Sequence, residues 1–164
     1  MKKNKGDIIK KIKVVIMGSE NAGKTTFMEK LIGNIGKVEY NGTTTAIDYG
    51  NIELNNKKIH IFGTPGQERF EFMRELTLKG VDFVILIIDI STGLKKVDKQ
   101  ILNKLKKDNI SYSIFINKID KTNNDIIDFL KEELLEKYNC KNIISGSAKE
   151  NIGISDVIEL LKTL

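Results

Sequence analysis

The sequence is poor in the residues that build disulfide-rich or membrane-spanning proteins. Its 164 residues include one cysteine, one proline, one histidine and no tryptophan. The single cysteine, Cys140, excludes an internal disulfide and favours a reducing compartment, so we expect a cytoplasmic protein. No run of 18 apolar residues occurs, and we therefore expect no membrane-spanning segment.

Arginine is also scarce, since Arg69 and Arg74 are the only two, and lysine supplies the net charge of +5. Scattered lysines usually form solvated faces, so we expect no nucleic-acid partner. The basic start of the chain lacks the apolar region and cleavage site of a signal peptide. We expect residues 1–11 to be a basic lead-in and residues 12–164 to form a single domain, monomeric by default.

Short apolar runs alternate with stretches of helical period along the chain. The run IKVVIM (12–17) predicts a buried strand, and VDFVILII (81–88) and SYSIFI (111–116) predict two more. Two alternating segments, 46–54 and 57–62, flank an Asn-Asn pair and predict a β-hairpin. The pattern predicts an α/β three-layer fold with a mostly parallel sheet and one antiparallel edge strand, whose ligands bind beyond the carboxyl ends of the strands.

The segment GSENAGKT (18–25) fits the pattern G-x-x-x-x-G-K-[ST] between a predicted strand and a predicted helix. Its glycines allow backbone N–H groups to form a nest for phosphate oxygens, and the helix dipole adds to the attraction. Lys24 is expected to bridge the β- and γ-phosphates and the Thr25 hydroxyl to bind Mg²⁺. The expected phosphate contacts are Glu20, Asn21, Ala22, Gly23, Lys24, Thr25 and Thr26.

The segment NKID (117–120) directly follows a predicted strand. Asp120 can accept two hydrogen bonds from the N1–H and N2–H₂ groups of guanine, whereas adenine would leave it unpaired at a cost of ~1–3 kcal/mol. Lys118 is expected to lie along the base, and Asn117 to tie this loop to the phosphate loop. A later segment, SAK, would offer the Ala148 N–H to guanine O6. The expected base site comprises Asn117, Lys118, Asp120, Ser147, Ala148 and Lys149.

These motifs occur in this order, and the element TPGQERF (64–70) lies between the first two. With this arrangement the sequence resembles the Ras-like small GTPases over essentially its whole length. The resemblance implies a small G-protein fold of the P-loop class, with a six-stranded sheet, about five helices, GTP and GDP as ligands, and Mg²⁺. It also implies switch loops near residues 34–45 and 63–75. The P-G-Q element is most similar to the prokaryotic MglA-like branch of gliding-motility and polarity GTPases.

The resemblance assigns further roles within the two switch loops. Aligning Asp48 with the pattern T-I-G-x-D-F-G makes Thr44 the residue that senses the γ-phosphate and also binds Mg²⁺, with Thr43 as the alternative register. Gln67 is expected to orient the attacking water and the Gly66 backbone to contact the γ-phosphate. Both arginines are expected to lie at the surface or to bind partners.

Two residues depart from the usual pattern of these GTPases. Gly63 stands where most members carry an aspartate that supports Mg²⁺, so we expect a weakened metal site. The resemblance to the MglA-like branch implies that this departure is shared there, because that branch likewise lacks the aspartate. Thr64 or Asp89 could supply an outer contact to the metal, although capping of a nearby loop is the preferred role for Asp89. Glu20 is expected beside the γ-phosphate, where a carboxylate indicates slow turnover.

The leading hypothesis is a switch that hydrolyses GTP to GDP slowly and takes an arginine from an activating partner. The resemblance further implies an effector and exchange proteins, and it allows a partner of roadblock fold. The alternative is a pseudo-GTPase that holds guanine nucleotide without turnover, which Gly63 and Glu20 favour. A P-loop kinase or ATPase is disfavoured by Asp120.

Overall fold

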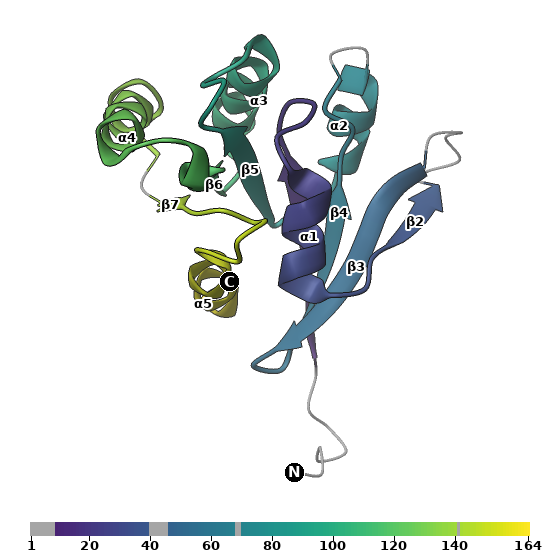
Figure 1. Ribbon diagram of the computed structural model, residues 1–164. Helices are drawn as coiled ribbons and strands as arrows, with labels where there is room; N and C mark the ends of the chain where they lie inside the picture. The colour runs from purple at the N-terminus through teal and green to yellow at the C-terminus, as the bar shows by residue number, and fades with distance from the viewer. Residues whose placement is uncertain (1–8, 40–45, 68–69, 141) are drawn as a thin grey trace.

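The computed structural model describes residues 9–39, 46–67, 70–140 and 142–164, in which strands and helices alternate (Figure 1). The strands are β1 (Lys10–Met17), β2 (Gly36–Glu39), β3 (Ala46–Leu54), β4 (Lys57–Gly63), β5 (Phe83–Asp89), β6 (Tyr112–Asn117) and β7 (Ile143–Ser145). The helices are α1 (Lys24–Ile32), α2 (Glu71–Thr77), α3 (Lys96–Lys107), α4 (Asn124–Tyr138) and α5 (Ile154–Lys162), with a short 3₁₀ helix at Ile119–Lys121. The predicted α/β fold is confirmed, and β1 begins two residues before the expected start of the domain.

The strands form one sheet in the order β2-β3-β4-β1-β5-β6-β7. The expected count of six was wrong, because residues 36–39 add a seventh strand at the edge. Val38 is the only apolar residue of β2 apart from glycine, so the hydrophobic pattern of the sequence does not predict this strand. Backbone pairing with β3 holds it in place. The antiparallel strand, β3, therefore lies one place inside the edge.

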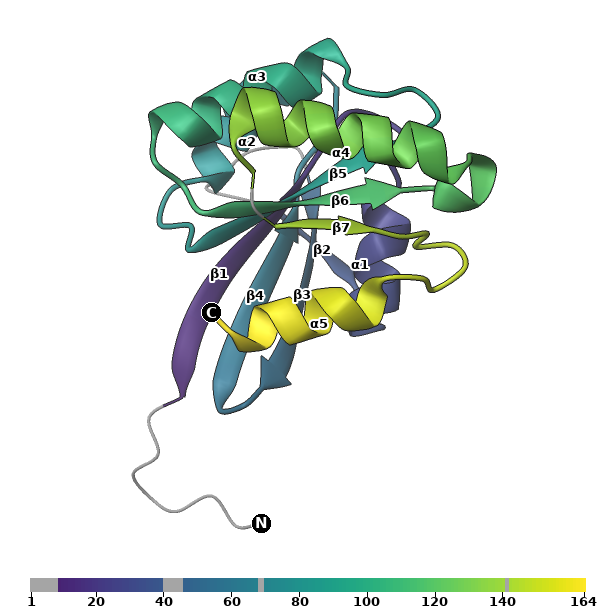
Figure 2. The same cartoon turned by 90° about the vertical axis from the view of Figure 1, so that its left-hand side faces the viewer.

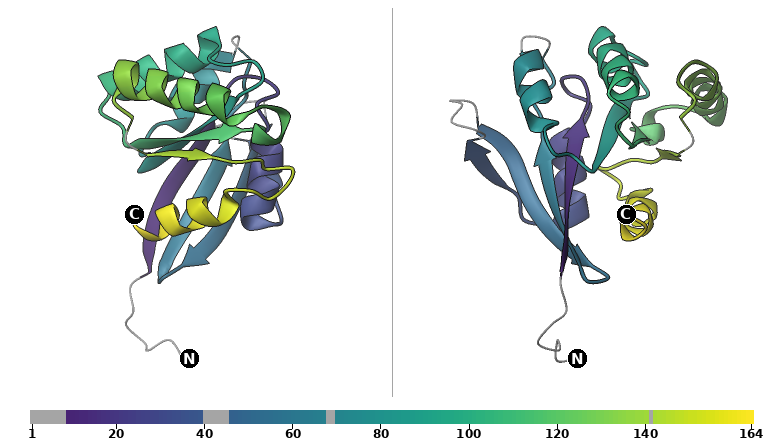
Figure 3. Two further views of the ribbon diagram at one scale, coloured as in Figure 1. Left: turned by 60° about the vertical axis from the view of Figure 1, so that its left-hand side comes forward. Right: turned by 180° about the vertical axis from the view of Figure 1, so that it is seen from behind.

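Two helical layers cover the two faces of the sheet (Figure 2). Helices α1 and α5 pack on one face, and α3 and α4 on the other. Strand β1 serves both layers, because Ile12, Val14 and Ile16 point to the first and Val15 and Met17 to the second. This alternation is the period of two of a buried strand. Both views in Figure 3 show the loop between β1 and α1 running from the sheet towards α2 and α3.

The hairpin predicted between β3 and β4 is confirmed. Asn55 and Asn56 form its two-residue turn with φ angles of 49° and 61°, the left-handed pair that a tight hairpin requires. This turn pairs Leu54 with Lys57, and the register then runs along the strands until Asp48 faces Gly63. The turn at one end of the hairpin thus determines which residues meet at the other end.

Among the described residues, we find no helix with the length and apolar character needed to cross a bilayer.

Candidate functional site

The loop between β1 and α1 has the backbone shape of a phosphate-binding nest. Gly18, Asn21 and Gly23 take positive φ angles of 149°, 64° and 98°. At Gly18 a side chain is excluded, since a Cβ atom would lie 2.4 Å from the Ile87 carbonyl oxygen. Left-handed residues at intervals along a loop turn successive N–H groups inward, which creates a concave site for an anion.

Lys24 begins helix α1, and its ammonium group lies within this loop. Its Nζ atom donates to the carbonyl oxygens of Gly18 at 2.9 Å and Ser19 at 2.8 Å. Burial lowers the pKa of Lys24 to about 8, although nearby carboxylates, Asp98 first among them, oppose the shift. A desolvated cation held beside inward-pointing N–H groups is suited to bind phosphate.

Asp98 on α3 holds the phosphate loop from the other side, a role that our sequence analysis missed. Its carboxylate accepts the Ser19 N–H at 3.1 Å and the Lys95 N–H at 2.9 Å, and its side chain is fully buried. Burial also raises the pKa of Asp98. An acidic residue at the third position of a helix is typical of a helix cap, and Asp98 does cap α3 through the Lys95 N–H. The local sequence does not indicate its second contact, with Ser19, which is 79 residues away.

A cavity of about 290 Å³ opens in front of the phosphate loop. The predicted residues Glu20, Asn21, Lys24, Thr25, Gly66 and Gln67 line it together with Lys37, Ala46, Ile47, Asp48, Gly63, Thr64, Pro65 and Phe70. Gly66 packs directly on the loop, because a Cβ atom there would lie 2.5 Å from the Glu20 nitrogen. The structure thus brings four of the expected phosphate-loop residues, among them the expected metal ligand Thr25, to one cavity with Gly66 and Gln67.

Asp48 is a site residue that our sequence analysis used only for alignment. Its Oδ2 atom accepts a hydrogen bond from the Thr25 hydroxyl at 2.9 Å, and its Oδ1 atom forms an ion pair with Lys37. Asp48 is 8% exposed. The predicted hairpin contained the signal, because counting back from the Asn-Asn turn places Asp48 opposite Gly63.

Gln67 and its loop are held by two partners in this structure. The Gln67 Nε2 atom donates to Glu20 Oε1 at 2.9 Å, and Arg74 donates to the carbonyl oxygens of Gln67 at 2.7 Å and Pro65 at 3.3 Å. Arg74 is 3% exposed. The expectation that it lies at the surface or binds partners was therefore wrong, since its guanidinium faces inward and secures the loop that carries Gln67.

A second cavity, of about 240 Å³, lies beside the first at the carboxyl end of β6. Its lining combines three predicted elements, with Gly23 and Thr26 from the phosphate loop, Asn117, Lys118, Asp120 and Lys121 from the NKID segment, and Ala148 and Lys149 from the SAK segment. Asp120 is exposed at its rim. Ser147 is buried beneath it, and its hydroxyl accepts the Glu150 N–H.

Asn117 ties the NKID segment to the phosphate loop, as predicted, and also contacts the SAK segment, which was not predicted. Its Nδ2 atom donates to the Ala22 carbonyl oxygen at 2.8 Å, and its Oδ1 atom accepts the Ala148 N–H at 2.9 Å. The Ala148 N–H, which we assigned to guanine O6, thus points to Asn117 in this structure. It is engaged because Asn117 is buried and its amide oxygen needs a donor.

Lys118 and Asp89 form a second bridge to the phosphate loop. The Lys118 ammonium donates to the Asn21 carbonyl oxygen and to Asp89 Oδ2, both at 2.8 Å. Burial acts to raise the pKa of Asp89, but hydrogen bonds from Lys118 and Ser91 outweigh it and hold the pKa below its usual value. The preferred role of Asp89 as a loop cap is confirmed by its bonds to the Ser91 N–H and hydroxyl.

The other candidates fall into two groups. The Thr64 hydroxyl donates to the Ile16 carbonyl oxygen at 3.1 Å, which gives this buried residue a structural role. Thr43, Thr44 and Arg69 lie outside the described residues. Within the part of the chain that the structure describes, no three His, Cys, Asp or Glu side chains gather as a metal-binding group.

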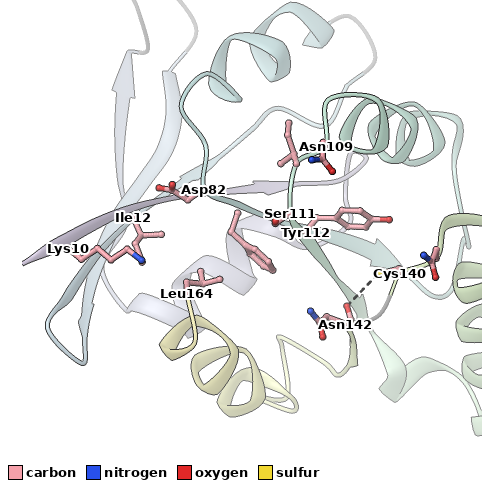
Figure 4. A pocket seen from close by; sticks show the side chains of 12 residues that line it. Lys10, Ile12, Asp82, Asn109, Ser111, Tyr112, Cys140, Asn142 and Leu164 are labelled. Carbon is pink, nitrogen blue, oxygen red and sulfur yellow. Dashed lines mark hydrogen bonds between the residues drawn. The ribbon is translucent and has the colours of Figure 1, made fainter.

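A separate cavity of about 770 Å³ opens at the amino ends of β1, β5 and β6 (Figure 4). Lys10, Asp82, Tyr112 and Leu164 are among its lining residues. None of the predicted site residues lines it, since they follow the carboxyl ends of the strands. The candidate site therefore consists of the two smaller cavities, the first lined by Lys24 and the second by Asn117.

The sequence is similar to those of known GTP-binding proteins. The profile of the family described as "50S ribosome-binding GTPase" matches residues 13–118. An uncharacterised protein of Methanocaldococcus jannaschii is 50% identical over 147 residues, which cover 90% of this chain and 92% of that protein. Translation initiation factor IF-2 of Mycoplasmopsis pulmonis is 34% identical over 154 residues, which are 89% of this chain but 25% of the factor. The chain thus spans about a quarter of that factor.

Solved structures with the same fold include translation factors and a ribosomal RNA-binding protein. Elongation factor SelB from Methanococcus maripaludis, in complex with a GTP analogue, aligns with a TM-score of 0.79 at 22% identity, over 94% of this chain and 34% of SelB. Era in complex with MgGDPNP and 16S ribosomal RNA aligns with a TM-score of 0.77 at 21% identity, over 95% of this chain and 57% of Era. At these identities the likeness shows the fold, a G domain with a mixed sheet.

Proposed function

Because the chain belongs to the 50S ribosome-binding GTPase family, we propose that it is a guanine-nucleotide switch that hydrolyses GTP to GDP slowly. The observation that carries this proposal is the bridge made by Asn117, which joins the Ala22 carbonyl of the phosphate loop to the Ala148 N–H of the SAK segment. This bridge sets the distance between a phosphate site and a base site. A nucleoside triphosphate is the ligand that needs both sites at once.

The two cavities fit the two ends of that ligand. The nest formed by Gly18–Thr25 and the buried Lys24 ammonium offer donors and charge to the phosphates. Asp120 at the rim of the other cavity can accept both N–H groups of the guanine edge. Lys118 would lie along the base, and a ligand would have to compete with Asn117 for the Ala148 N–H.

The residues for hydrolysis surround the first cavity. Lys24 would stabilise the charge that develops on the phosphate oxygens, and Gln67 would orient the attacking water. Thr25 and Thr44 are the residues proposed to hold Mg²⁺, which neutralises phosphate charge when it is bound. In this structure Gln67 is bonded to Glu20, so it has to break that bond before it can orient a water. We therefore expect slow hydrolysis without a partner.

The switch segments near residues 34–45 and 63–75 would change shape when the γ-phosphate leaves. No arginine occurs between residues 33 and 45, so that segment offers no arginine finger in cis. An activating protein that brings one would increase the rate by about 10³–10⁵-fold. We further propose an MglA-like switch that acts in the cytoplasm as a monomer and binds a roadblock-type partner.

A pseudo-GTPase is the second candidate, and the Gln67–Glu20 hydrogen bond favours it. If that bond persists with GTP in place, Gln67 cannot reach the water, and the protein would hold GTP without turnover.

The lining of the phosphate cavity argues against this second candidate. Gln67 and Lys24 both line that cavity, and a protein that only held nucleotide would have no use for Gln67 there.

A competition experiment tests the proposal. Protein stripped of nucleotide is titrated with fluorescent GDP, and GTP, ATP and XTP are added as competitors. We expect GTP to compete about ten- to a hundredfold better than ATP, and Asp120→Asn to shift the preference towards XTP, because an amide can donate to the xanthine 2-oxygen. Equal competition by ATP and GTP would contradict the proposal.

A further inference from the structure

Strand β4 ends at Gly63, the position where most Ras-like small GTPases, though not the MglA-like branch, carry a carboxylate that supports Mg²⁺. Glycine offers no ligand. The neighbouring strand β3 runs antiparallel to β4, and its residue opposite Gly63 is Asp48. A carboxylate is therefore present at the same level of the sheet, but on the adjacent strand.

The Asp48 side chain reaches the space that a side chain at position 63 would enter. A Cβ atom built on Gly63 would lie 3.2 Å from the Asp48 Cβ and 3.7 Å from its Oδ2 atom. It would also lie 2.7 Å from the Met28 sulfur, which is too close for an unshifted side chain. Glycine at 63 and aspartate at 48 are thus complementary, because the first makes room for the second.

The carboxylate also makes the contact that a metal-supporting group requires. Asp48 Oδ2 accepts a hydrogen bond from the Thr25 hydroxyl at 2.9 Å, and Thr25 is the expected metal ligand of the phosphate loop. Both residues line the cavity in front of that loop. Carboxylate, hydroxyl and water oxygens are the ligands that Mg²⁺ prefers, so the set fits this ion.

A cation already occupies the other oxygen of this carboxylate. Lys37 on the edge strand β2 forms an ion pair with Asp48 Oδ1, while its own side chain is 65% exposed. Lys37, Asp48 and Gly63 form one row across β2, β3 and β4. Because Asp48 is almost fully buried, its charge needs a partner, and an exposed lysine can withdraw at little cost.

We propose that Asp48 replaces the carboxylate missing at Gly63 and helps to hold Mg²⁺ beside Thr25, and that Lys37 balances its charge until the metal binds. This inference rests on the proposed function. It adds that the metal and Lys37 compete for one carboxylate, so that Mg²⁺ binding loosens the attachment of the edge strand β2, which lies within the first switch segment.

The test measures Mg²⁺ affinity without relying on turnover. Protein loaded with fluorescent GDP is titrated with Mg²⁺, and the rate of nucleotide release reports metal occupancy. For Asp48→Asn we expect the Mg²⁺ midpoint to rise about 10- to 100-fold, with release in EDTA unchanged. For Lys37→Met we expect tighter Mg²⁺ binding by about three- to fivefold, because a competing cation is gone. Matched controls are Glu53→Gln on β3 and Lys58→Met on β4, which should leave the midpoint unchanged.

Two further results separate the possible failures. Wild-type protein that binds no GDP even with Mg²⁺ in excess would overturn the proposed function itself. Wild-type protein that binds GDP, with an Asp48→Asn variant that keeps the wild-type Mg²⁺ midpoint, would overturn this inference alone. An Asp48→Asn variant that loses thermal stability but responds normally to Mg²⁺ would show a purely structural ion pair, which also overturns it.

Discussion

Lys24 is the residue on which phosphate binding depends, and its charge is marginal at slightly alkaline pH. Its acceptors are two backbone carbonyl oxygens, and burial lowers its pKa to about 8. A bound phosphate would raise this pKa again, since the opposite charge favours the protonated form. Nucleotide binding above pH 8 therefore has to take up a proton.

This linkage gives a pH dependence with a definite sign. As pH rises through the pKa of the free protein, Lys24 loses its proton and the affinity for GDP falls. We expect roughly fourfold weaker binding at about pH 8.5 than at about pH 7, with proton uptake in the same range. Calorimetry in two buffers of different ionisation enthalpy measures both. Affinity that stays constant, with no proton uptake, would show that Lys24 stays fully charged.

Glu20 restrains Gln67 through a single hydrogen bond of 2.9 Å. In Glu20→Ala this acceptor is absent, so Gln67 is free to orient a water. We expect the rate of phosphate release from bound GTP to rise several-fold in Glu20→Ala, which is less than the roughly 10²–10⁴-fold that a fully positioned acid or base contributes. Gln67→Leu serves as the control and should be slower than wild type. A Glu20→Ala variant slower than wild type would assign Glu20 a supporting role instead.

At the scale of elements, Arg74 links helix α2 to the loop that precedes it. The guanidinium donates to the carbonyl oxygens of Pro65 and Gln67 while it is almost fully buried. The second switch segment is thereby tied to its own helix. Sequence reasoning misplaced this residue because an arginine in a surface helix is usually exposed, and no local pattern records contacts seven and nine residues back.

Removing this tie should affect the switch segment more than the fold. For Arg74→Met, which keeps the buried stem but deletes the donors, we expect faster hydrogen exchange at residues 64–67. We also expect a loss of about 1–3 kcal/mol in the free energy of unfolding. Lys99→Met, at an exposed position of α3, is the comparison variant and should change the free energy of unfolding little. Unchanged exchange in Arg74→Met would show that other contacts hold the loop.

The β3–β4 hairpin shows which features of an element can be predicted from the sequence and which cannot. Its two-residue turn was predictable, and with it the pairing of Asp48 with Gly63. The direction of the Asp48 carboxylate was not, because it depends on Thr25, which is 23 residues away, and on Lys37. Strand β2 was missed for a similar reason, since its mostly polar residues become a strand only through pairing with β3.

At the scale of the whole molecule, Asn117 connects the two ends of the site across the sheet. Motif order alone predicted that the phosphate, NKID and SAK segments would meet, because loops after parallel strands share one edge. Asp98 belongs to no motif, and Asp48 belongs only to the pattern used for alignment, which gave it no role; the packing of α3 and β3 against the phosphate loop brings both there. The motif residues were thus predictable, and the residues that hold them were not.

Replacing Asn117 tests this connection. In Asn117→Ala the Ala22 carbonyl and the Ala148 N–H both lose a buried partner, so we expect a loss of about 2–4 kcal/mol in the free energy of unfolding. Urea denaturation measures it, with the exposed Asn51→Ala as the matched control. We also expect weaker GDP binding. An Asn117→Ala variant as stable as the control would show that the loops hold their positions independently.

The most direct test of the account is a single-turnover measurement of phosphate release from wild-type protein loaded with GTP. With Mg²⁺ we predict slow release of phosphate, below about one turnover per second. In EDTA we predict none. GTP that remains intact for hours with Mg²⁺ present would contradict a hydrolysing switch and identify a protein that only holds guanine nucleotide.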